Sequence, residues 1–571
     1  MRIPINRRAA VAPLALLCLA GISAPLHAQQ AGQAPAGGSQ LQQIAPLPQP
    51  RRAAPEIRVE QGDTPAAAAT DTTRISVQTL RVTGQSIYLE AELIALTGFK
   101  PGSELTLTEL RALAAKIGAH YRAKGYFTAR AFLAAQDVKD GIVTITVSEG
   151  RFGKITLNNQ SNVSNTIIEG LMDGIKSGDA ITAGALEQRL LLLSDLPGLN
   201  VKSNLAPGAS VGASDLVIDV TPGARINGSV DLDNEGNRYT GGNRIGGTVN
   251  VNEPFGQGDV ATVRAFTSTQ GINYARAAYQ MQLGALNANR VKAGVAYTTL
   301  DYRLGREFAA LLAKGSAEIG SVYASYPWLR LRNANLSTQL AFDAKKFQDK
   351  TDSTNTVTDK KVRLLMASVT GDVRDEFFGG GLNNFSLTWT AGNIDIVTPL
   401  AQANDAAALR THGRYDKLGF TAARQQSLFA NTVLYAAVNA QFAGKNLDSS
   451  EKLGLGGANA VRAYPSGEAF GDQGYVLNLE LRYALPQWLE SQPGQMQLTG
   501  FIDTGSVTLN KSPIANGNNR RTLSGIGLGL SWNDPGNFLL RIVYATKVGN
   551  AVTTSVPDSP SRVWLQGVKF F

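Results

Sequence analysis

The feature of this chain that most constrains its fold is an alternation of apolar and polar residues that recurs from residue 224 to residue 571. The stretch 475–483 reads YVLNLELRY, and the same period of two is found at 245–252, 275–283 and 336–345. A period of two is that of a β-strand with two different faces. Because one face is apolar and the other is polar and often charged, the pattern predicts strands that contact lipid on one side and a wet lumen on the other.

The length of this region predicts how many strands it holds. Residues 224–571 divide into about sixteen units at roughly 22 residues for one strand and its loop. An antiparallel β-sandwich is the alternative, but charges recur on the face that would form its core, and no short connecting pattern unites two sheets. The chain ends in Phe570 and Phe571, and a C-terminal aromatic residue is typical of outer-membrane barrels. We therefore predict a mainly β protein with a 16-stranded transmembrane antiparallel β-barrel at 224–571.

The start of the chain has the three parts of a secretory signal peptide. Arginines come first, an apolar core follows at 11–22, and the residues Leu26, His27 and Ala28 form a cleavage site. No later segment has 18 uninterrupted apolar residues, so no transmembrane helix is predicted. Export without such a helix is consistent with an outer-membrane barrel. We assign 1–28 to the signal peptide.

Composition argues against several classes of function. Without the three signal arginines, 51 basic residues face 45 acidic ones, and this small, dispersed excess predicts no nucleic-acid partner. The single cysteine, Cys18, lies in the signal peptide, and His120 and His412 are far apart in sequence. The sequence therefore supports no zinc site, no Cys/His nucleophile and no nucleotide-binding loop, and we predict neither enzymatic activity nor a cofactor.

Between the signal peptide and the barrel, the sequence predicts a tether and two repeated domains. Residues 29–73 are rich in Ala, Gln, Pro and Gly and read as a disordered tether, in which only Gln40 to Ala45 could start a short helix. Residues 74–150 and 151–222 each show the order β-α-α-β-β, with helical runs at three- and four-residue spacing.

Glycines at 525, 527 and 529 share one face of a predicted strand, opposite Ile526 and Leu528. Small residues facing the lumen would leave room for an inserted loop. The alternative is ordinary glycine in a twisted strand, and the sequence does not choose between them.

Two short segments each stand out by one charged residue: a lone arginine in the first and a lone carboxylate in the second. LGGANAVRAYPSGEAFGDQGY at 455–475 places Arg462 between Val461 and Tyr464, and FIDTG at 501–505 places Asp503 in an apolar strand. Asp503 has the opposite phase to Ile502, so it points into the lumen if Ile502 contacts lipid. A guanidinium and a carboxylate can pair through two parallel hydrogen bonds, and we predict that these two groups do so.

These segments resemble the VRGY/F loop motif and the FxDxG strand motif of the two-partner secretion transporters, the family of the haemolysin and filamentous-haemagglutinin transporters. The chain departs from the family in having Ala463 where glycine is usual. The resemblance implies a loop–barrel lock between Arg462 and Asp503. The remaining motif residues, first of the loop and then of the strand, are Val461, Tyr464, Gly471, Asp472 and Gly474, and Phe501 and Gly505.

The resemblance further implies that 74–150 and 151–222 are small α+β POTRA domains in the periplasm. It implies an outer-membrane pore, without ATP or cofactor, that exports a large β-helical partner such as an adhesin or haemolysin. That partner would carry an N-terminal haemagglutinin-like secretion domain and bind somewhere within 74–222, and the pore itself would be monomeric. An assembly factor that inserts other barrels is the alternative, although only two POTRA repeats are counted; a passive porin or receptor is a further one.

Overall fold

The computed structural model describes residues 35–44, 56–59, 73–210, 212–284, 290–487, 491–514 and 516–571. The predicted signal peptide and much of the predicted tether lie outside the described residues. Among the helices of these ranges, none is both long enough and apolar enough to cross a membrane.

The first domain is a small α+β unit whose helices form where the sequence has a three- and four-residue period. Its elements are β2 (Arg74–Val77), β3 (Thr79–Thr83), α2 (Glu90–Thr97), β4 (Ser103–Thr106), α3 (Leu107–Ala123), β5 (Arg130–Phe132) and β6 (Ile142–Ser148). A capping box fixes the start of α3, since the Thr106 side chain accepts from the Glu109 backbone and Glu109 accepts from the Thr106 backbone. The strands β3, β6 and β5 form one sheet in that order, and the helices bury their apolar faces against it.

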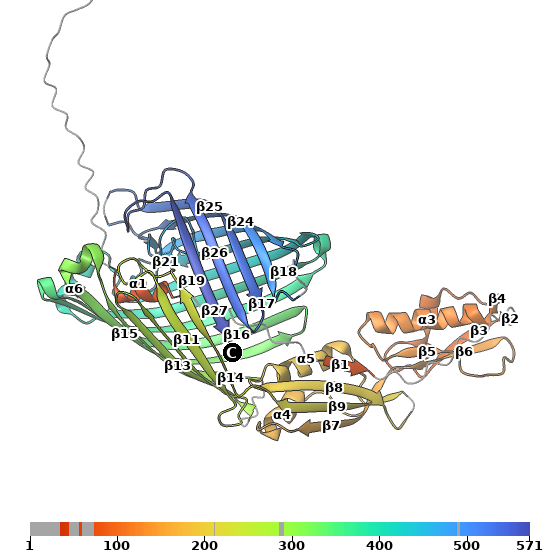
Figure 1. The fold of residues 1–571 in the computed structure, drawn as a ribbon. Coiled ribbons are helices and arrows are strands. Elements are labelled where there is room, and N and C mark those ends of the chain that lie inside the picture. The colour runs from red at the N-terminus through yellow and green to blue at the C-terminus, as the bar shows by residue number, and fades with distance from the viewer. Residues whose placement is uncertain are drawn as a thin grey trace, which may run out of the picture. The chain divides into compact units, whose positions relative to one another are not determined.

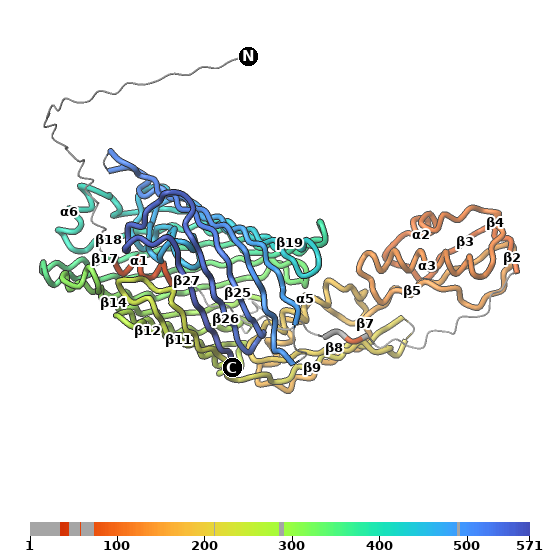
Figure 2. The backbone as a smooth tube through the Cα atoms, turned by 45° about the horizontal axis from the view of Figure 1, so that its top comes forward, coloured from red at the N-terminus to blue at the C-terminus, as the bar shows by residue number. Residues whose placement is uncertain are grey.

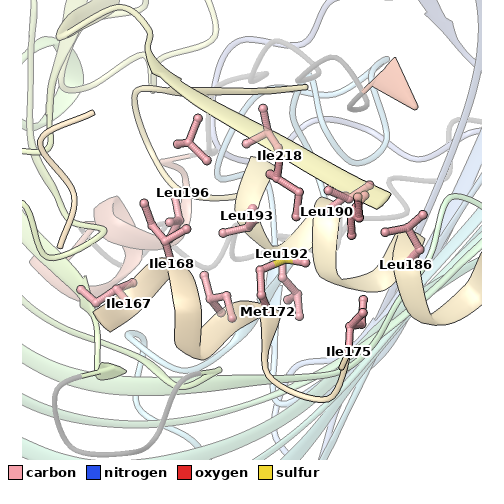
Figure 3. Packing of buried hydrophobic residues seen from close by; sticks show 14 of the residues in the cluster. Ile167, Ile168, Met172, Ile175, Leu186, Leu190, Leu192, Leu193, Leu196 and Ile218 are labelled. Atoms are coloured by element: carbon pink, nitrogen blue, oxygen red, sulfur yellow. The ribbon is translucent and has the colours of Figure 1, made fainter. Parts of the chain in front are cut away.

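The second domain has the order β-α-α-β-β, with β7 (Arg151–Asn159), α4 (Asn165–Met172), α5 (Ala183–Ser194), β8 (Leu199–Pro207) and β9 (Ala213–Pro222). The first domain has in addition the paired strands β2 and β4, which the predicted order did not include; β4 lies between its two helices in the chain. Its core is a dense aliphatic cluster, in which residues such as Ile168 and Leu190 are fully buried (Figure 3). The sheet order is β1-β8-β9-β7, because the short strand β1 (Glu56–Val59) pairs in parallel with β8. A piece of the predicted tether thus covers one edge of this sheet.

Sixteen antiparallel strands close into a barrel in chain order (Figure 1). They are β10 (Ile226–Asp233), β11 (Arg244–Asn252), β12 (Val260–Ser268), β13 (Ile272–Gln282), β14 (Lys292–Arg303), β15 (Ala313–Arg330), β16 (Ala334–Thr351), β17 (Thr356–Asp375), β18 (Gly381–Ile396), β19 (Gly413–Phe429), β20 (Thr432–Ala443), β23 (Gln473–Ala484), β24 (Gln495–Thr508), β25 (Arg520–Asp534), β26 (Phe538–Lys547) and β27 (Ser561–Phe570). The predicted class, a 16-stranded barrel preceded by two small α+β domains, is confirmed.

The period of two in the sequence corresponds to the two faces of the barrel wall. Leu477, Leu479 and Leu481 of β23 are exposed on the outside, while Asn478 and Glu480 face inward. The last strand lies beside β26 and closes the barrel against β10, where Ser229–Asp233 pair with Gln566–Phe570 (Figure 2).

Strand direction separates two kinds of connection. In the chain, β10 follows directly after the second domain. The end of the barrel at which β10 begins is therefore the end that is connected to the two domains. At that end the turns are short, as between β15 and β16. At the other end lie the longest connections, one of which contains α6 (Pro399–Ala407). Short turns on the periplasmic side and long loops outside are the usual pattern of outer-membrane barrels.

A six-residue helix, α1 (Gly37–Gln42), lies within the barrel beside β14, β15 and β16 (Figure 1). It starts before Gln40, so the predicted start was wrong. The sequence disfavoured Gly37 and Gly38 because glycine weakens a helix by about 1 kcal/mol. Here their lack of a side chain permits close packing: a Cβ on Gly38 would lie 2.6 Å from the Cβ of Ser450.

Candidate functional site

The candidate site is the connection between β20 and β23, residues 444–472, which we call the central loop. It contains the two-residue strands β21 (Leu453–Gly454) and β22 (Phe470–Gly471), which pair with each other. Val461, Ala463 and Tyr464 are fully buried, together with wall residues such as Val476 and Trp564. A loop with so many buried residues is folded into the barrel and packs against its wall.

The structure brings Arg462 and Asp503 together. The Nε atom of Arg462 donates to Asp503 Oδ2 at 2.8 Å, and Nη2 donates to Asp503 Oδ1 at 2.6 Å. The backbone N–H of Arg462 also donates to Oδ2, at 3.0 Å. Asp503 is fully buried and Ile502 is 54% exposed, which is the orientation that the strand phase predicts.

A second carboxylate, which the sequence analysis did not single out, completes the contacts of the guanidinium. Arg462 Nη1 lies 2.7 Å from Glu480 Oε1 on β23, and Glu480 in turn accepts from Arg482. The Arg462 guanidinium also lies over the Phe501 ring, 3.5 Å from its centroid. Arginine uses its planar fork and its flat face at once here, which an ammonium group cannot do.

Two further residues orient this cluster. Asn478 Nδ2 donates to Asp503 Oδ1 in the wall at 2.7 Å and to the Ala460 carbonyl in the loop at 3.0 Å. One side chain of the wall therefore contacts both the carboxylate of the ion pair and the backbone of the loop. Trp564 Nε1 donates to the Arg462 carbonyl at 2.7 Å. A signal for Asn478 existed in the sequence, because an antiparallel hairpin places a neighbouring strand's inward polar residues beside Asp503. Many inward residues are polar, and the pattern does not rank them.

The other predicted loop residues divide between the tip and the ends of the loop. Val461 packs in the buried cluster at the tip, and the Tyr464 hydroxyl donates to the Ala551 carbonyl at 3.0 Å. Asp472 lies away from Arg462: its carboxylate holds Lys452 Nζ at 2.7 Å and accepts from two backbone N–H groups. Gly471 approaches β24 closely, since its Cβ would lie 2.6 Å from the Thr508 carbonyl oxygen.

Glycines of the wall make room for the loop at two places. A Cβ on Gly505 would lie 2.6 Å from Leu455 Cδ1, and one on Gly525 would lie 2.4 Å from the Cβ of Ala463. Within the glycine run of β25, Gly525 therefore serves the inserted loop. Gly529 does not, because every neighbour of its Cβ would be at least 3.5 Å away.

The last predicted glycine, Gly474, stands at the start of β23, and its Cβ would lie 2.3 Å from the Ser506 carbonyl oxygen of the adjacent strand. A side chain there would separate β23 from β24 at the point where the central loop enters the wall. This glycine therefore serves the junction between loop and barrel.

A third acidic residue, Glu468, was also missed by the sequence analysis. Its side chain is fully buried and lies 2.7 Å from Arg521 Nη2. It accepts four more hydrogen bonds, from the backbones and hydroxyls of Thr554 and Ser555 in the connection between β26 and β27. Two residues of the central loop thus anchor it: Arg462 binds the strands of the wall, and Glu468 binds the neighbouring connection between β26 and β27.

This arrangement fixes the position of a polypeptide segment inside the barrel. Across the described ranges no three histidine, cysteine or acidic side chains are placed to hold a metal ion. The buried charges are paired with opposite charges, which is what keeps a polar segment folded inside a barrel.

Comparison with protein families gives two matches. The family described as haemolysin secretion/activation protein ShlB/FhaC/HecB matches residues 212–532, and the POTRA domain of ShlB type matches residues 75–150. The first match covers more than half of the chain.

Individual relatives agree with the family match. The chain is 28% identical to the heme/hemopexin transporter protein HuxB of Haemophilus influenzae over 478 residues, covering 82% of each. It is 23% identical to the outer membrane transporter CdiB of Dickeya dadantii, covering 70% of each.

Solved structures share the fold. CdiB from Escherichia coli matches with a TM-score of 0.68 at 19% identity, over 90% of this chain and 93% of that one. BamA from Haemophilus ducreyi, without its first three POTRA domains, matches with a TM-score of 0.53 at 15% identity, over 87% of this chain and 100% of that one. The chain belongs to the ShlB/FhaC/HecB family of haemolysin secretion/activation proteins, and is an outer-membrane transporter of the two-partner secretion type with its POTRA domains in the periplasm.

Proposed function

We propose that this protein exports one large β-helical partner protein, an adhesin, a haemolysin or a similar protein, through its barrel. The partner would present an N-terminal haemagglutinin-like secretion domain to the periplasmic side. Membership of a family of two-partner transporters supports a secreted protein as the cargo. The pore would work as a monomer in outer-membrane lipid, without nucleic acid, cofactor or catalysis.

The observation that carries this proposal is the central loop, folded inward and held by Arg462 between Asp503 and Glu480. A passive porin has no use for a loop anchored by a buried guanidinium. We propose that the pair of Arg462 and Asp503 is a lock that keeps the loop where it can guide an emerging chain. The aromatic face of Phe501 and the Trp564 bond to the loop backbone support a fixed position for the tip.

Capture of the partner would begin on the domains within 74–222. An extended chain can add to an exposed sheet edge through backbone hydrogen bonds that depend little on sequence. One edge of the second domain, β8, is covered by β1, whereas β7 forms the other edge. A polar cavity of about 420 Å³ lies at the end of β7; its lining includes Asn158, Asn159 and Glu169. Because β7 pairs on one side only, with β9, its other side leaves backbone groups for an added strand, and we propose this edge as the place of capture.

The proposed division of the chain follows from these roles. Residues 1–28 would direct export, 29–73 would tether α1 as a plug, 74–150 and 151–222 would capture the partner, and 224–571 would conduct it. Folding of the partner outside the cell would drive transport, because a folded chain cannot slide back.

Deleting the gene and comparing culture supernatants tests the proposal. We expect one large protein to disappear from the supernatant and to return when the gene is supplied in trans, while the levels of other outer-membrane barrels stay unchanged. A general loss of outer-membrane barrels would instead indicate an assembly factor. An unchanged supernatant would contradict export by this pore.

A further inference from the structure

The base of the central loop carries buried charges that the Arg462 contacts do not involve. Asp448 and Glu451 lie in the turn at 447–451, and both are less than a tenth exposed. Three lysines from the wall face them. Lys360 Nζ is 2.9 Å from Asp448 Oδ2, and Lys345 and Lys417 lie 2.8 Å and 3.0 Å from the two oxygens of Glu451. We call these three lysines the lysine seat.

The seat is separate from the Arg462 contacts. Its lysines come from β16, β17 and β19, whereas Asp503 and Glu480 come from β24 and β23. Lys417 also donates to the Glu451 carbonyl at 2.8 Å, so it fixes the backbone of the turn as well as the carboxylate. The turn at 447–451 therefore has its own anchor in the wall.

Helix α1 rests on this turn and on its surroundings. The Gln42 side-chain amide donates to the Ser450 carbonyl, and Gly38 packs against Ser450. At the other end of the helix, the Gly37 N–H donates at 3.0 Å to Asp349, which lies 4.0 Å from Lys360. Two contacts of α1 are thus made to Ser450, and a third is made to Asp349. Both residues lie beside lysines of the seat or beside carboxylates that these lysines bind.

The helix makes few contacts that could hold it without the seat. Leu41 and the nearby Ile44 are only partly buried against the barrel's internal apolar cluster. Two side-chain bonds join it to the connection after β10, from Thr240 to Gln40 and from Asn237 to Gln43. A single isolated helix of six residues is far below the length that is stable in water. Its place therefore depends on the surface that the barrel offers.

From this geometry we propose that the lysine seat positions α1 in the pore, by fixing the turn at 447–451 to which the helix binds. Three lysines balance three carboxylates there: Asp349, Asp448 and Glu451. Glu451 has two of these lysines, whereas Asp448 is paired with Lys360 alone among the three. Removing Lys360 therefore leaves Asp448 buried without an opposite charge, and the turn moves to expose that charge to water. The Ser450 acceptor moves with the turn, and α1 leaves, while the contacts of Arg462 remain.

The test measures access to α1 in the purified full-length pore in vesicles, without any partner protein. The test therefore does not depend on the proposed export. The only native cysteine is Cys18, which is replaced by serine, and Leu41→Cys serves as the reporter for a membrane-impermeant maleimide. The rate at which the maleimide labels this cysteine measures how often α1 leaves its position in the barrel.

Lys360→Met is the main variant, and Lys361→Met is its matched control. Lys361 is the next residue on the same strand, but its side chain is exposed. We expect Lys360→Met to raise the labelling rate by about tenfold or more. Lys361→Met should leave it unchanged. In bilayers, Lys360→Met should also open to higher conductance.

Two further variants separate the seat from general damage. Asp448→Asn combined with Lys360→Met removes the stranded charge and should lower the labelling rate again. Lys360→Arg keeps the positive charge and should label like the parent. If Lys360→Met does not insert as a folded barrel, Asp448→Asn alone must raise the labelling rate. Labelling of the folded Lys360→Met variant, or in its place of Asp448→Asn, at the rate of the Lys361→Met control would overturn the proposal.

Discussion

The second POTRA domain and the barrel differ in the charges that they bury. The core of the domain is aliphatic and includes Ile168, Leu186 and Leu190. The barrel also buries apolar clusters, but it buries charges such as Asp503 and Glu468 as well, each beside an arginine, and many of its leucines and valines are exposed on the outside.

The difference shows that the burial of side chains stabilises the two regions in different ways. In the domain, an apolar side chain leaves water on folding, and that transfer is the main stabilising contribution. On the outside of the barrel, an apolar side chain faces lipid, so its position says little about the path of the loops. Inside, charge pairs and close backbone contacts act together with apolar packing, such as that of Val461 and Tyr464, to determine where the central loop lies.

The largest effect on stability should come from the domain core. Leu190 is fully buried in α5, and Leu190→Ala should lower the free energy of unfolding of the 74–222 module by about 2–5 kcal/mol, through lost burial and a cavity. Leu89→Ala removes the same atoms from a residue that is 76% exposed and should cost little. Denaturant unfolding followed by circular dichroism compares the two, and equal midpoints would contradict the assignment of the core.

A smaller loss of stability should follow when a methyl group is added between the central loop and the barrel wall. Gly525→Ala places a Cβ 2.4 Å from that of Ala463, and such overpacking costs about 1–3 kcal/mol. Export should fall, and adding Ala463→Gly should restore it, because the second change removes the opposing Cβ. Gly529→Ala on the same strand is the control, with no contact under 3.5 Å. Normal export by Gly525→Ala at normal barrel levels would show that this contact does not position the loop.

A pH-dependent effect is expected at Glu149, in the junction of the two domains. Burial raises the pKa of this carboxyl group, but hydrogen bonds from Ser86, Ile87 and Tyr121 outweigh it, and the net pKa lies below the usual 4.5. A lowered pKa means that the group stabilises the fold above the usual value and that this contribution is lost as the pH falls through the folded-state pKa.

Comparing the 74–222 module with its Glu149→Gln variant at about pH 6 and about pH 3 measures this contribution. The variant should be the less stable of the two at the higher pH, and the difference should shrink at the lower pH. A stability difference that is the same at both values would contradict the role of the ionised carboxylate.

The smallest effect should come from an ion pair at the barrel surface. Arg238 and Glu307 lie 2.7 Å apart, but their side chains are 35% and 49% exposed, so water and salt screen them. Arg238→Gln should leave both thermal stability and export within the scatter of the assays. A loss of export as large as that of Arg462→Ala would mean that exposed and buried charges contribute alike, against the comparison drawn above.

Much of the fold followed from the sequence because it rests on long periodic patterns. The barrel required only the period of two and the length of 224–571, and the helices of the domains followed from their three- and four-residue spacing. Helix α1 was misplaced, since its glycines are favourable only next to Ser450 and Tyr302. A contact of this kind depends on the tertiary fold and leaves no local signal.

The site was predicted only where a motif isolates a residue. Arg462 stood out as the one basic residue of its segment, and Asp503 as the one charge of an apolar strand segment. Glu480 belongs to a strand where polar residues alternate regularly, and Glu468 belongs to a polar loop, so neither differs from its surroundings. Their roles depend on the path of the central loop through the lumen, which period and spacing do not determine.

The most direct test of the account is the export of the partner by Arg462→Ala, Asp503→Ala and the double variant, at matched barrel levels in the outer membrane. Removing one member of a protein-screened pair costs about 3–5 kcal/mol or less in a wet lumen, because the other charge is stranded. We predict that each single variant inserts but exports poorly, and that the double variant is no worse than either. Unimpaired export by both single variants would contradict the lock.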